Sequence, residues 1–292
     1  MVVTIKTYQE RNEDQLMELL QACFEEKSVR SLMNRAHDVY AAMVGTELAG
    51  IVFSWSNSFH PFCTYIRILC HPCYRHLQVE EKLVEKALDN RKDSLPLQTS
   101  IWETSVSLKE LYTKKGFKEI RRTYMTTLKV AHVVEHPFDR SENAELKTLA
   151  DIEANKHLTD ELAGLVKRHY EETHLDNPVA HFSVSEWKDM IFADDVMKNG
   201  SYVLVDQSER HIAAYSFLHE GSQENFVELG WFGASDDEAL ILPIIQQQIL
   251  DSLNNGIELI TGEFDTTSTY AMNVLKHFPF APSPTWITYR LT

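Results

Sequence analysis

The sequence predicts a mixed α/β (α+β) fold built as two similar domains in tandem, each a mostly antiparallel twisted sheet flanked by helices. The 292 residues are too many for one ordinary core and suit two domains of about 140 residues. Strand and helix periodicities alternate along the chain, and the same order of elements occurs in both halves. Corresponding aromatic residues also keep a nearly constant spacing, with 162 positions from Tyr40 to Tyr202 and 163 from Phe117 to Phe280.

The first half begins with an alternating strand pattern and continues with amphipathic helices and a hairpin. Gly45-Thr46-Glu47 is a turn between two strands, and Gly116 ends the last helix of this half. The expected strands are residues 2–7, 40–44, 48–55, 65–70, 97–101 and 118–128, and the expected helices are residues 13–24, 79–88 and 107–115.

The second half repeats this order and carries helix start signals of its own. Thr159 is placed to cap a helix, and Ser235-x-x-Glu238 has the pattern of a capping box. His169 and His174 are five positions apart, and we expect both on the surface. The other expected elements are strands at residues 202–205, 211–217, 226–232, 257–264 and 285–291, and helices at residues 239–253 and 269–277.

The joint between the halves is expected where the periodicity stops. His136-Pro137 and a cluster of charges interrupt the pattern, which predicts domains at residues 1–131 and 144–292 with a linker at 132–143. A spacing this long is not that of a solenoid repeat, so we interpret it as the duplication of one domain. Chance similarity between two α/β halves is the alternative.

The composition excludes several classes of partner. The formal net charge is −15, and such a surface repels phosphate backbones, so we expect no nucleic-acid partner. The sequence has no apolar run of about 18 residues, so no membrane partner is expected. The start, MVVTIKTYQER, lacks the apolar core of a signal peptide, which predicts a cytoplasmic protein. A homodimer stays open.

The cysteines offer a possible metal site that we weigh against a simpler interpretation. Cys70-His-Pro-Cys73 has the spacing of zinc and redox sites, with His60 and Cys63 nearby in the sequence. However, no second C-x-x-C pair completes four ligands, and Cys63 and Cys70 flank a strand. We therefore expect no metal and interpret these cysteines, together with Cys23, as small thiols packed against apolar residues.

Two segments of the first half carry the pattern of a known family. Ile68-Leu-Cys-His71-Pro-Cys-Tyr-Arg75 leads from a strand directly into the helix near Val79, and free N–H groups at such a helix start favour an anion. Further on, Tyr112 lies on a helix just before Gly116-Phe117. Together these motifs resemble those of the GCN5-related N-acetyltransferases. That family often has His-Pro-x-Tyr-Arg before a glycine loop, and a tyrosine before Gly-Phe.

The resemblance implies two tandem acyl-CoA N-acyltransferase-like domains. The first would bind acetyl-CoA as co-substrate and transfer its acetyl group to an amine of a small molecule or peptide. By resemblance, Tyr112 is the acid that reprotonates the CoA thiolate. Glu103, after a strand end, is the candidate base, and His60 is an alternative. The residues implied to contact the cofactor are Ile68, Leu69, Cys70, Arg75, His76, Leu77, Gln78, Val79, Glu80 and Ser105.

Departures from the family pattern keep a second hypothesis open. Gln78 and Glu80 occupy the two glycine positions of the loop. In the second half, Glu238 stands at the position of Arg75, and Leu275 replaces the tyrosine. A catalytically inactive binding or regulatory module is therefore the alternative to an acetyltransferase. For Tyr112 itself the alternative is an ordinary packed aromatic, and for Glu103 a solvated loop carboxylate.

Overall fold

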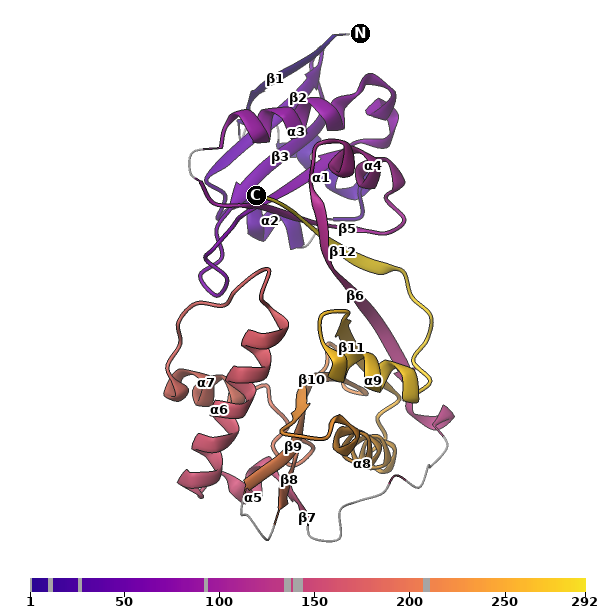
Figure 1. Ribbon diagram of the computed structural model, residues 1–292. Coiled ribbons are helices and arrows are strands. Elements are labelled where there is room, and N and C mark those ends of the chain that lie inside the picture. The colour runs from indigo at the N-terminus through magenta and orange to yellow at the C-terminus, as the bar shows by residue number, and fades with distance from the viewer. Residues whose placement is uncertain are drawn as a thin grey trace. The chain divides into compact units, whose positions relative to one another are not determined.

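The computed structural model describes residues 2–9, 13–25, 28–91, 94–133, 138, 144–206 and 211–292. In the first half, the elements are β1 (Val3–Thr7), α1 (Glu13–Ala22), α2 (Ser28–Met33), β2 (Asp38–Val44), β3 (Glu47–Trp55), β4 (Thr64–Cys70), the 3₁₀ helix η2 (Pro72–Leu77), α3 (Val79–Asp89), β5 (Leu97–Trp102), α4 (Val106–Lys114) and β6 (Lys118–Lys129) (Figure 1). A short 3₁₀ turn, η3 (Val130–His132), follows β6.

The second half repeats this order of strands and helices. Its elements are β7 (Ala144–Thr148), α5 (Leu149–Ile152), α6 (Lys156–Thr173), α7 (Val184–Ile191), β8 (Tyr202–Asp206), β9 (His211–Glu220), β10 (Phe226–Ala234), the 3₁₀ helix η4 (Glu238–Leu240), α8 (Ile241–Asn254), β11 (Leu259–Asp265), α9 (Thr269–His277) and β12 (Thr285–Leu291).

The strands of the described residues form one mixed sheet. Its order is β1-β2-β3-β4-β5-β12-β6-β11-β10-β9-β8-β7. The β4–β5 and β10–β11 pairs are parallel, and the hairpins on either side of them are antiparallel. The predicted fold class, a mixed α/β protein of two tandem units with mostly antiparallel strands, is confirmed.

The chain divides into two compact units that exchange their last strands. Unit 1 contains residues 1–120, 176–180 and 287–292, and unit 2 contains residues 121–175 and 181–286. Most of β6 therefore lies in unit 2, where it pairs with β11 from Leu259–Lys129 to Asp265–Thr123. In return, β12 lies next to β5 in unit 1, and Thr288 bonds to Ser100 there through their hydroxyls at 3.0 Å. Each compact unit therefore contains residues from both halves of the sequence.

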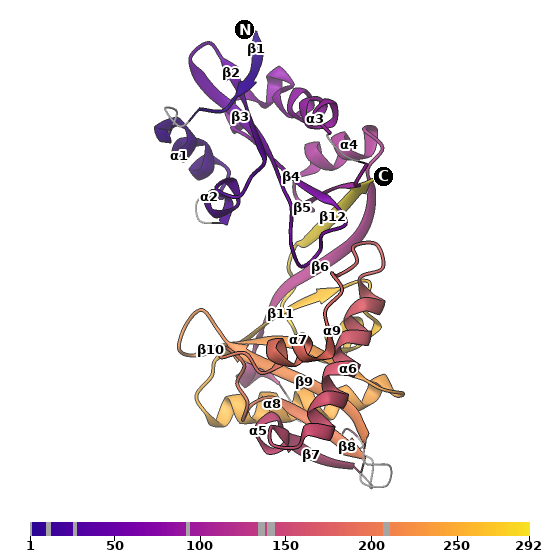
Figure 2. The same cartoon turned by 90° about the vertical axis from the view of Figure 1, so that its left-hand side faces the viewer.

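In unit 1, helices cover both faces of the sheet. Figure 2 shows α1 and α2 on one side of β1–β4 and α3 and α4 on the other. Each face has its own buried core, one with Leu19, Leu20 and Phe53 and the other with Leu83 and Tyr112. The two cores follow from the alternation of side chains along each strand.

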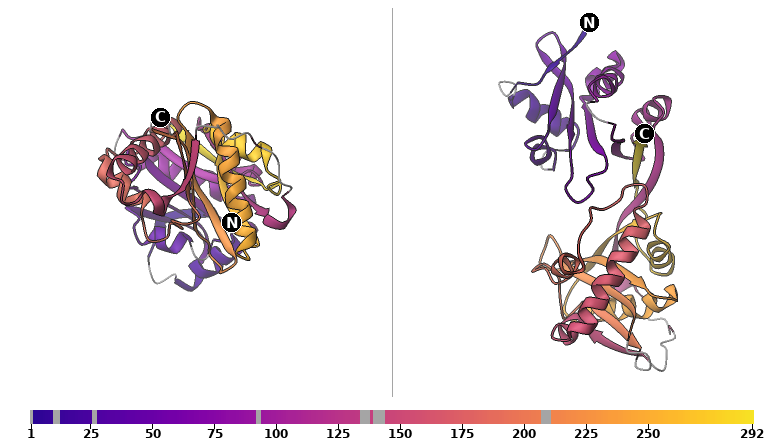
Figure 3. Two further views of the ribbon diagram at one scale, coloured as in Figure 1. Left: turned by 90° about the horizontal axis from the view of Figure 1, so that it is seen from below. Right: turned by 60° about the vertical axis from the view of Figure 1, so that its left-hand side comes forward.

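In unit 2, α6 and α7 cover one face and α8 and α9 the other, as the left view of Figure 3 shows for α6 and α8. The helix α8 is apolar over much of its surface, and its buried residues include Ile241, Ile245 and Ile249. The aromatic cluster on the opposite face contains Tyr170, Trp187 and Trp231, with ring centroids 5.3–5.7 Å apart.

Several local predictions in unit 2 were wrong. Asn155, not Thr159, caps α6, because the Asn155 side chain accepts the Leu158 N–H at 3.2 Å while Thr159 is buried. The Ser235 hydroxyl donates to the Ala213 carbonyl at 3.3 Å, so no capping box forms. Asp237 caps η4 instead. His169 is buried in unit 2 and not on the surface.

Candidate functional site

The candidate site is the loop that joins β4 to α3 in unit 1. The His71 imidazole accepts the Cys73 N–H at 3.3 Å and so caps η2, with Pro72 in its first turn. The first N–H groups of α3 have no acceptor within the helix. Gly50 of β3 lets α3 lie close to the sheet here, because a Cβ at this position would be 3.0 Å from a Val79 methyl carbon and 3.1 Å from a Leu83 methyl carbon.

Gln78, which connects η2 to α3, has a left-handed backbone. Its φ is 57° and its ψ is 34°, a conformation that favours glycine and costs other residues roughly 1 kcal/mol. Gln78 thus has a glycine-like backbone conformation at a position where the resemblance implies a glycine. Gln78 is exposed, while Val79 directly after it is buried.

Glu80, at the second glycine position, is buried within the loop. Its side chain is 11% exposed, and its carboxylate lies 3.6 Å from Nε of Arg75, whose side chain is 56% exposed. Burial raises the pKa of Glu80, while the Arg75 charge and a hydrogen bond from Ser107 of α4 oppose that shift. The cation expected to hold an anion is thus already paired with a carboxylate of the same loop.

Next to the loop, β4 and β5 separate. Their parallel pairing covers only Thr64–Leu97 and Tyr65–Gln98. Beyond these pairs Arg67 bridges the strands, because its guanidinium donates to the Ser100 carbonyl at 3.2 Å and lies 3.4 Å from the Glu25 carboxylate. Leu69 and Cys70, two of the residues that the resemblance implies contact the cofactor, lie on β4 beyond its pairing with β5.

Tyr112 is fully buried in the core between α4 and the sheet. Its ring packs against Phe117 and Tyr289, with centroids 5.1 and 5.9 Å away. Burial raises the pKa of Tyr112 to about 12, and the Thr99 hydroxyl and the Arg67 charge oppose this. Neither the Tyr112 nor the Thr99 hydroxyl has a hydrogen bond of normal geometry to another described residue. The Tyr112 and Thr99 hydroxyls thus lie near each other in the core, and Thr99 interacts with the phenol without a hydrogen bond of normal geometry.

Cys23, Cys70 and Cys73 lie in and around this loop as free thiols, whereas Cys63 is buried before the start of β4. Cys23 donates to the Cys70 carbonyl at 3.5 Å, and Cys70 to the His71 carbonyl at 3.6 Å. Burial raises the pKa of Cys70 to about 12 and that of Cys23 to about 11, so both stay protonated at neutral pH. No group of three or more His, Cys, Asp or Glu side chains in the described part of the chain is arranged to hold a metal ion.

Comparisons with known proteins rest on structure, because no family model and no curated protein matches this sequence. A GCN5-related N-acetyltransferase from Sphaerobacter thermophilus has a TM-score of 0.67 at 13% identity, over 99% of this chain and 95% of its own. A tandem GNAT protein from the clavulanic acid biosynthesis pathway has a TM-score of 0.58 at 12% identity, over 99% and 98% of the two chains.

The chain has the GCN5-related N-acetyltransferase fold. The likeness extends over both halves, in agreement with the duplication inferred from the sequence. Among the described residues, no helix is both long enough and apolar enough to span a membrane.

Within this fold, the remaining predicted residues lie after β5. Glu103 is half-buried in the turn between β5 and α4. Ser105 is the N-cap of α4, but its side chain makes no capping hydrogen bond, and its N–H donates to the Trp102 carbonyl at 2.9 Å. His60 is buried, with Nδ1 2.8 Å from the Asn177 carbonyl oxygen. The structure therefore brings Arg75, Gln78 and Glu80 together and places Glu103 and Ser105 in a separate turn.

The equivalent loop of unit 2 has no features of an anion site. Glu238 begins η4 after the acidic Asp236 and Asp237, and α8 starts with no side-chain cap. Leu275 packs against the α8 core of unit 2. This loop presents carboxylates where the first loop presents Arg75.

Sequence reasoning missed three residues of the site: Arg67, Ser107 and Gly50. A charged residue inside an otherwise apolar strand, as in Tyr65-Ile-Arg67-Ile-Leu, was the signal that could have found Arg67, because buried arginines need partners. The sequence offers no comparable signal for Ser107, since its contact with Glu80 joins two helices.

Proposed function

We propose that this protein is an N-acetyltransferase that binds acetyl-CoA at the β4–α3 loop of unit 1. The observation that carries the proposal is the left-handed backbone at Gln78, directly before the open start of α3 and beside Arg75. A left-handed backbone at a glutamine costs free energy. Such strain is typical of sites where a ligand closely approaches the backbone. The acceptor would be an amine of a small molecule or peptide, and the protein would act in the cytoplasm.

The loop residues fit a pyrophosphate in part. The N–H groups at the start of α3 and the exposed Arg75 side chain would bind its oxygens, with His76, Leu77, Gln78 and Val79 forming the loop wall. Acetyl-CoA would supply an acetyl group activated as a thioester. Ile68, Leu69 and Cys70 would line its path along β4, and amides there would polarise the carbonyl. Glu80 opposes binding through its negative charge.

Two side chains have proposed proton-transfer roles. Glu103 would take a proton from the ammonium of the acceptor, directly or through water. Tyr112 would return a proton to the thiolate, and its pKa of about 12 keeps the phenol protonated at neutral pH. Ser105 would contact the cofactor at the start of α4. The buried Tyr112 hydroxyl, whose interaction with Thr99 lacks normal hydrogen-bond geometry, supports a polar group of a ligand near it.

Calorimetric titration of the full chain with acetyl-CoA tests the proposal. We expect saturable binding that weakens at least tenfold in Arg75→Ala, because the guanidinium is the main cation of the loop. Arg35→Ala is the matched control, since Arg35 is also an exposed arginine of unit 1. No heat at millimolar acetyl-CoA, or equal weakening in both variants, would contradict the proposal.

Tyr112→Phe tests the proposed acid. The hydroxyl has no partner of normal geometry, so its removal should leave the melting temperature unchanged or raise it. Turnover, followed as thiol release with a panel of amines, should fall roughly a hundredfold. An unchanged rate with unchanged acetyl-CoA binding would assign Tyr112 to packing alone.

A non-catalytic binding or regulatory module is the second candidate. The Arg75–Glu80 pair and the full burial of Tyr112 favour it. Acetyl-CoA binding with no turnover on any amine, in wild type and in Glu80→Gln, would support this alternative.

A further inference from the structure

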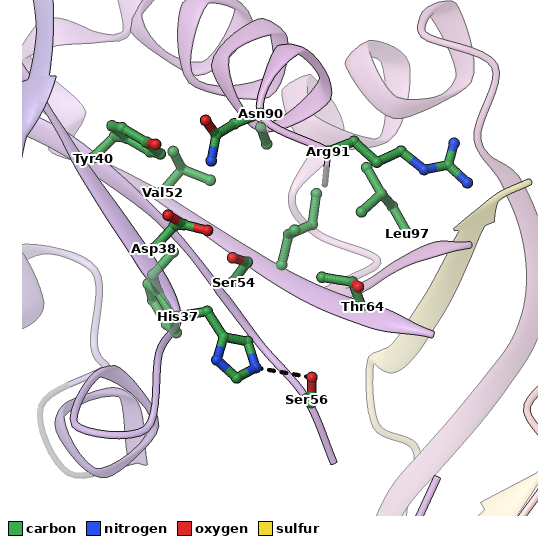
Figure 4. Close-up of a pocket in the computed structure, with 13 residues that line it drawn as sticks. His37, Asp38, Tyr40, Val52, Ser54, Ser56, Thr64, Asn90, Arg91 and Leu97 are labelled. Atoms are coloured by element: carbon green, nitrogen blue, oxygen red, sulfur yellow. Dashed lines mark hydrogen bonds between the residues drawn. The ribbon is translucent and has the colours of Figure 1, made fainter. Parts of the chain in front are cut away.

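A pocket of about 180 Å³ lies in unit 1 at the far end of α3 from the cofactor loop. Its walls come from β2, β3, the start of β4, the end of α3 and the start of β5 (Figure 4). None of the described residues that line it belongs to the loop of residues 71–80. The 11 residues of α3 rise about 16 Å, so the two sites are separated by roughly the length of this helix.

The strand register gathers polar and apolar residues of the pocket on one face of the sheet. Asp38 of β2 pairs with Ser54 of β3, and Ser54 pairs with Ile66 of β4. Thr64 lies two residues before Ile66, on the same face of β4, and pairs with Leu97 of β5. Side chains that are paired in this way are about 5 Å apart, so these groups can contact one small ligand together.

Three side chains of the pocket can donate hydrogen bonds into it. The Asn90 amide reaches down from the end of α3 with its nitrogen toward the strands, and the Ser54 hydroxyl lies below it on the sheet (Figure 4). The Thr64 hydroxyl is the third donor. Within the described part of the chain, none of these three side chains is hydrogen-bonded to another residue. Their donors are therefore available to a bound molecule.

The charges around the pocket favour a neutral ligand. Because Asn90 turns an N–H inward, it offers no acceptor to an ammonium group. Asp38 already interacts with another group, so it does not provide a separate cation site, while its negative charge opposes an anion. The Arg91 guanidinium donates to the carbonyls of Ser94 and Leu95, at 3.2 and 2.7 Å, and points away from the pocket in Figure 4. An uncharged acceptor of hydrogen bonds thus fits these groups best.

The floor of the pocket is apolar. Val52, Ile66 and Leu97 line it, and all three are buried. At the 10–15 Å³ that one water needs, the volume has room for roughly a dozen waters, which suits a ligand of about ten heavy atoms. An apolar floor with a few convergent polar groups is the usual make-up of a small-molecule site.

We propose that this pocket binds a small neutral molecule with an apolar body and an oxygen that accepts hydrogen bonds, as in a primary alcohol or an amide. The oxygen would accept from the Asn90 amide and from the Ser54 or Thr64 hydroxyl, and the body would pack on Val52 and Leu97. The site is separate from the proposed acetyl-CoA loop and does not depend on it. The protein would then carry a second small-molecule site in the same unit.

Titration of the full chain with 2-phenylethanol tests this proposal, with phenethylamine and 3-phenylpropionate as cationic and anionic probes of similar size. We expect 2-phenylethanol to bind at least about threefold more tightly than either charged probe, because the pocket has no group that compensates for desolvating a charge. No binding of 2-phenylethanol, or tighter binding of a charged probe, would overturn the proposal.

Asn90→Leu separates the polar contacts from the apolar floor, because leucine has a similar size and no N–H donor in its side chain. The affinity for 2-phenylethanol should fall at least about threefold, while the affinity for ethylbenzene, which lacks the oxygen, should be undiminished. Ser54→Ala should show the same pattern even if Asn90→Leu folds poorly. Acetyl-CoA binding should be the same in both variants as in wild type.

Asn34→Leu is the matched control, because Asn34 is an exposed asparagine of unit 1 that does not line the pocket. It should bind 2-phenylethanol as wild type does. Ala87→Leu fills the pocket from α3 and should prevent binding of all four probes. An unchanged affinity for 2-phenylethanol in Asn90→Leu and Ser54→Ala, or equal losses of 2-phenylethanol and ethylbenzene binding there, would overturn the proposal, and so would undiminished binding in Ala87→Leu.

Discussion

At the scale of single residues, Glu80 places a buried carboxyl group in the β4–α3 loop, where acetyl-CoA is proposed to bind. Burial raises its pKa above the ordinary value of 4.5, so the folded state disfavours its charged form. The raised pKa of Glu80 therefore adds to the free energy of unfolding below pH 4.5, where the carboxyl group is protonated. This addition is lost as the pH rises through the raised pKa. Arg75, 3.6 Å away, offsets part of this loss.

Glu80→Gln should therefore gain stability relative to wild type as the pH rises from 4 to 8. Denaturant unfolding at several pH values would measure this difference. Acetyl-CoA affinity should also rise severalfold at neutral pH, because one negative charge leaves the loop. Weaker acetyl-CoA binding in Glu80→Gln would show that the carboxylate instead holds Arg75 in a productive position.

His169 affects the pH dependence of stability in the opposite direction to Glu80, because its pKa is also shifted but its neutral form is the deprotonated one. Burial and the neighbouring Arg168 charge lower its pKa from 6.5 to about 4, so the folded state holds the neutral imidazole, 3.2 Å from the Tyr215 hydroxyl. The free energy of unfolding should fall as the pH drops from 6.5 to 4. In this range His169 is protonated in the unfolded chain but stays neutral in the folded protein. In His169→Gln this loss should be smaller. Equal pH profiles of wild type and variant would contradict the assignment.

At the scale of elements, the close packing of α3 on the sheet depends on Gly50. A Cβ there would be 2.6 Å from the Leu69 carbonyl oxygen of β4 and 3.0 Å from a Val79 methyl carbon of α3, so Gly50→Ala must displace the β4 backbone and crowd the start of α3. We expect a loss of about 1–3 kcal/mol in the free energy of unfolding, measured with denaturant, and weaker acetyl-CoA binding as the loop moves.

Gly164→Ala is the control for this prediction. Gly164 lies within α6, and nothing lies within 4 Å of a Cβ added there. Alanine should stabilise this helix by roughly 0.5–1 kcal/mol. An increase in the free energy of unfolding in both Gly50→Ala and Gly164→Ala would contradict the close packing of α3 around Gly50.

At the scale of the whole molecule, the exchange of β6 and β12 makes each unit depend on the other half of the chain. The fragment 1–131 contains β6 but lacks β12, and the fragment 144–292 lacks β6, the partner of β11. Each fragment alone would leave strand edges unpaired and open to aggregation.

We therefore expect the two fragments to be insoluble or partly unfolded when made separately, and to form a 1:1 complex when made together. Size-exclusion chromatography and circular dichroism would measure this. Two separately folded monomers with sharp unfolding transitions would contradict the exchange, and would support independent domains at residues 1–131 and 144–292.

Local patterns in the sequence predicted most of the strands and helices, their duplication, and the loop that resembles an acetyltransferase motif, but they did not predict α2, β7, α5 or α7. The predicted features are local properties: apolar periodicity marks the buried face of each element, and Gly116 and Gly256 both have a positive φ just after a helix, as stop signals require. The resemblance implied a glycine position at Gln78, and the left-handed φ of this residue appears only in the structure.

Only the tertiary structure decided which elements lie together. The exchange of β6 and β12 joins strands more than a hundred residues apart, and no local pattern specifies such a partner. The burial of Glu80, Tyr112 and His169 depends on helices and strands that pack over them from elsewhere in the chain. Periodicity predicts that a side chain faces inward, but the charge, space and hydrogen-bond partners it meets there are fixed by long-range packing.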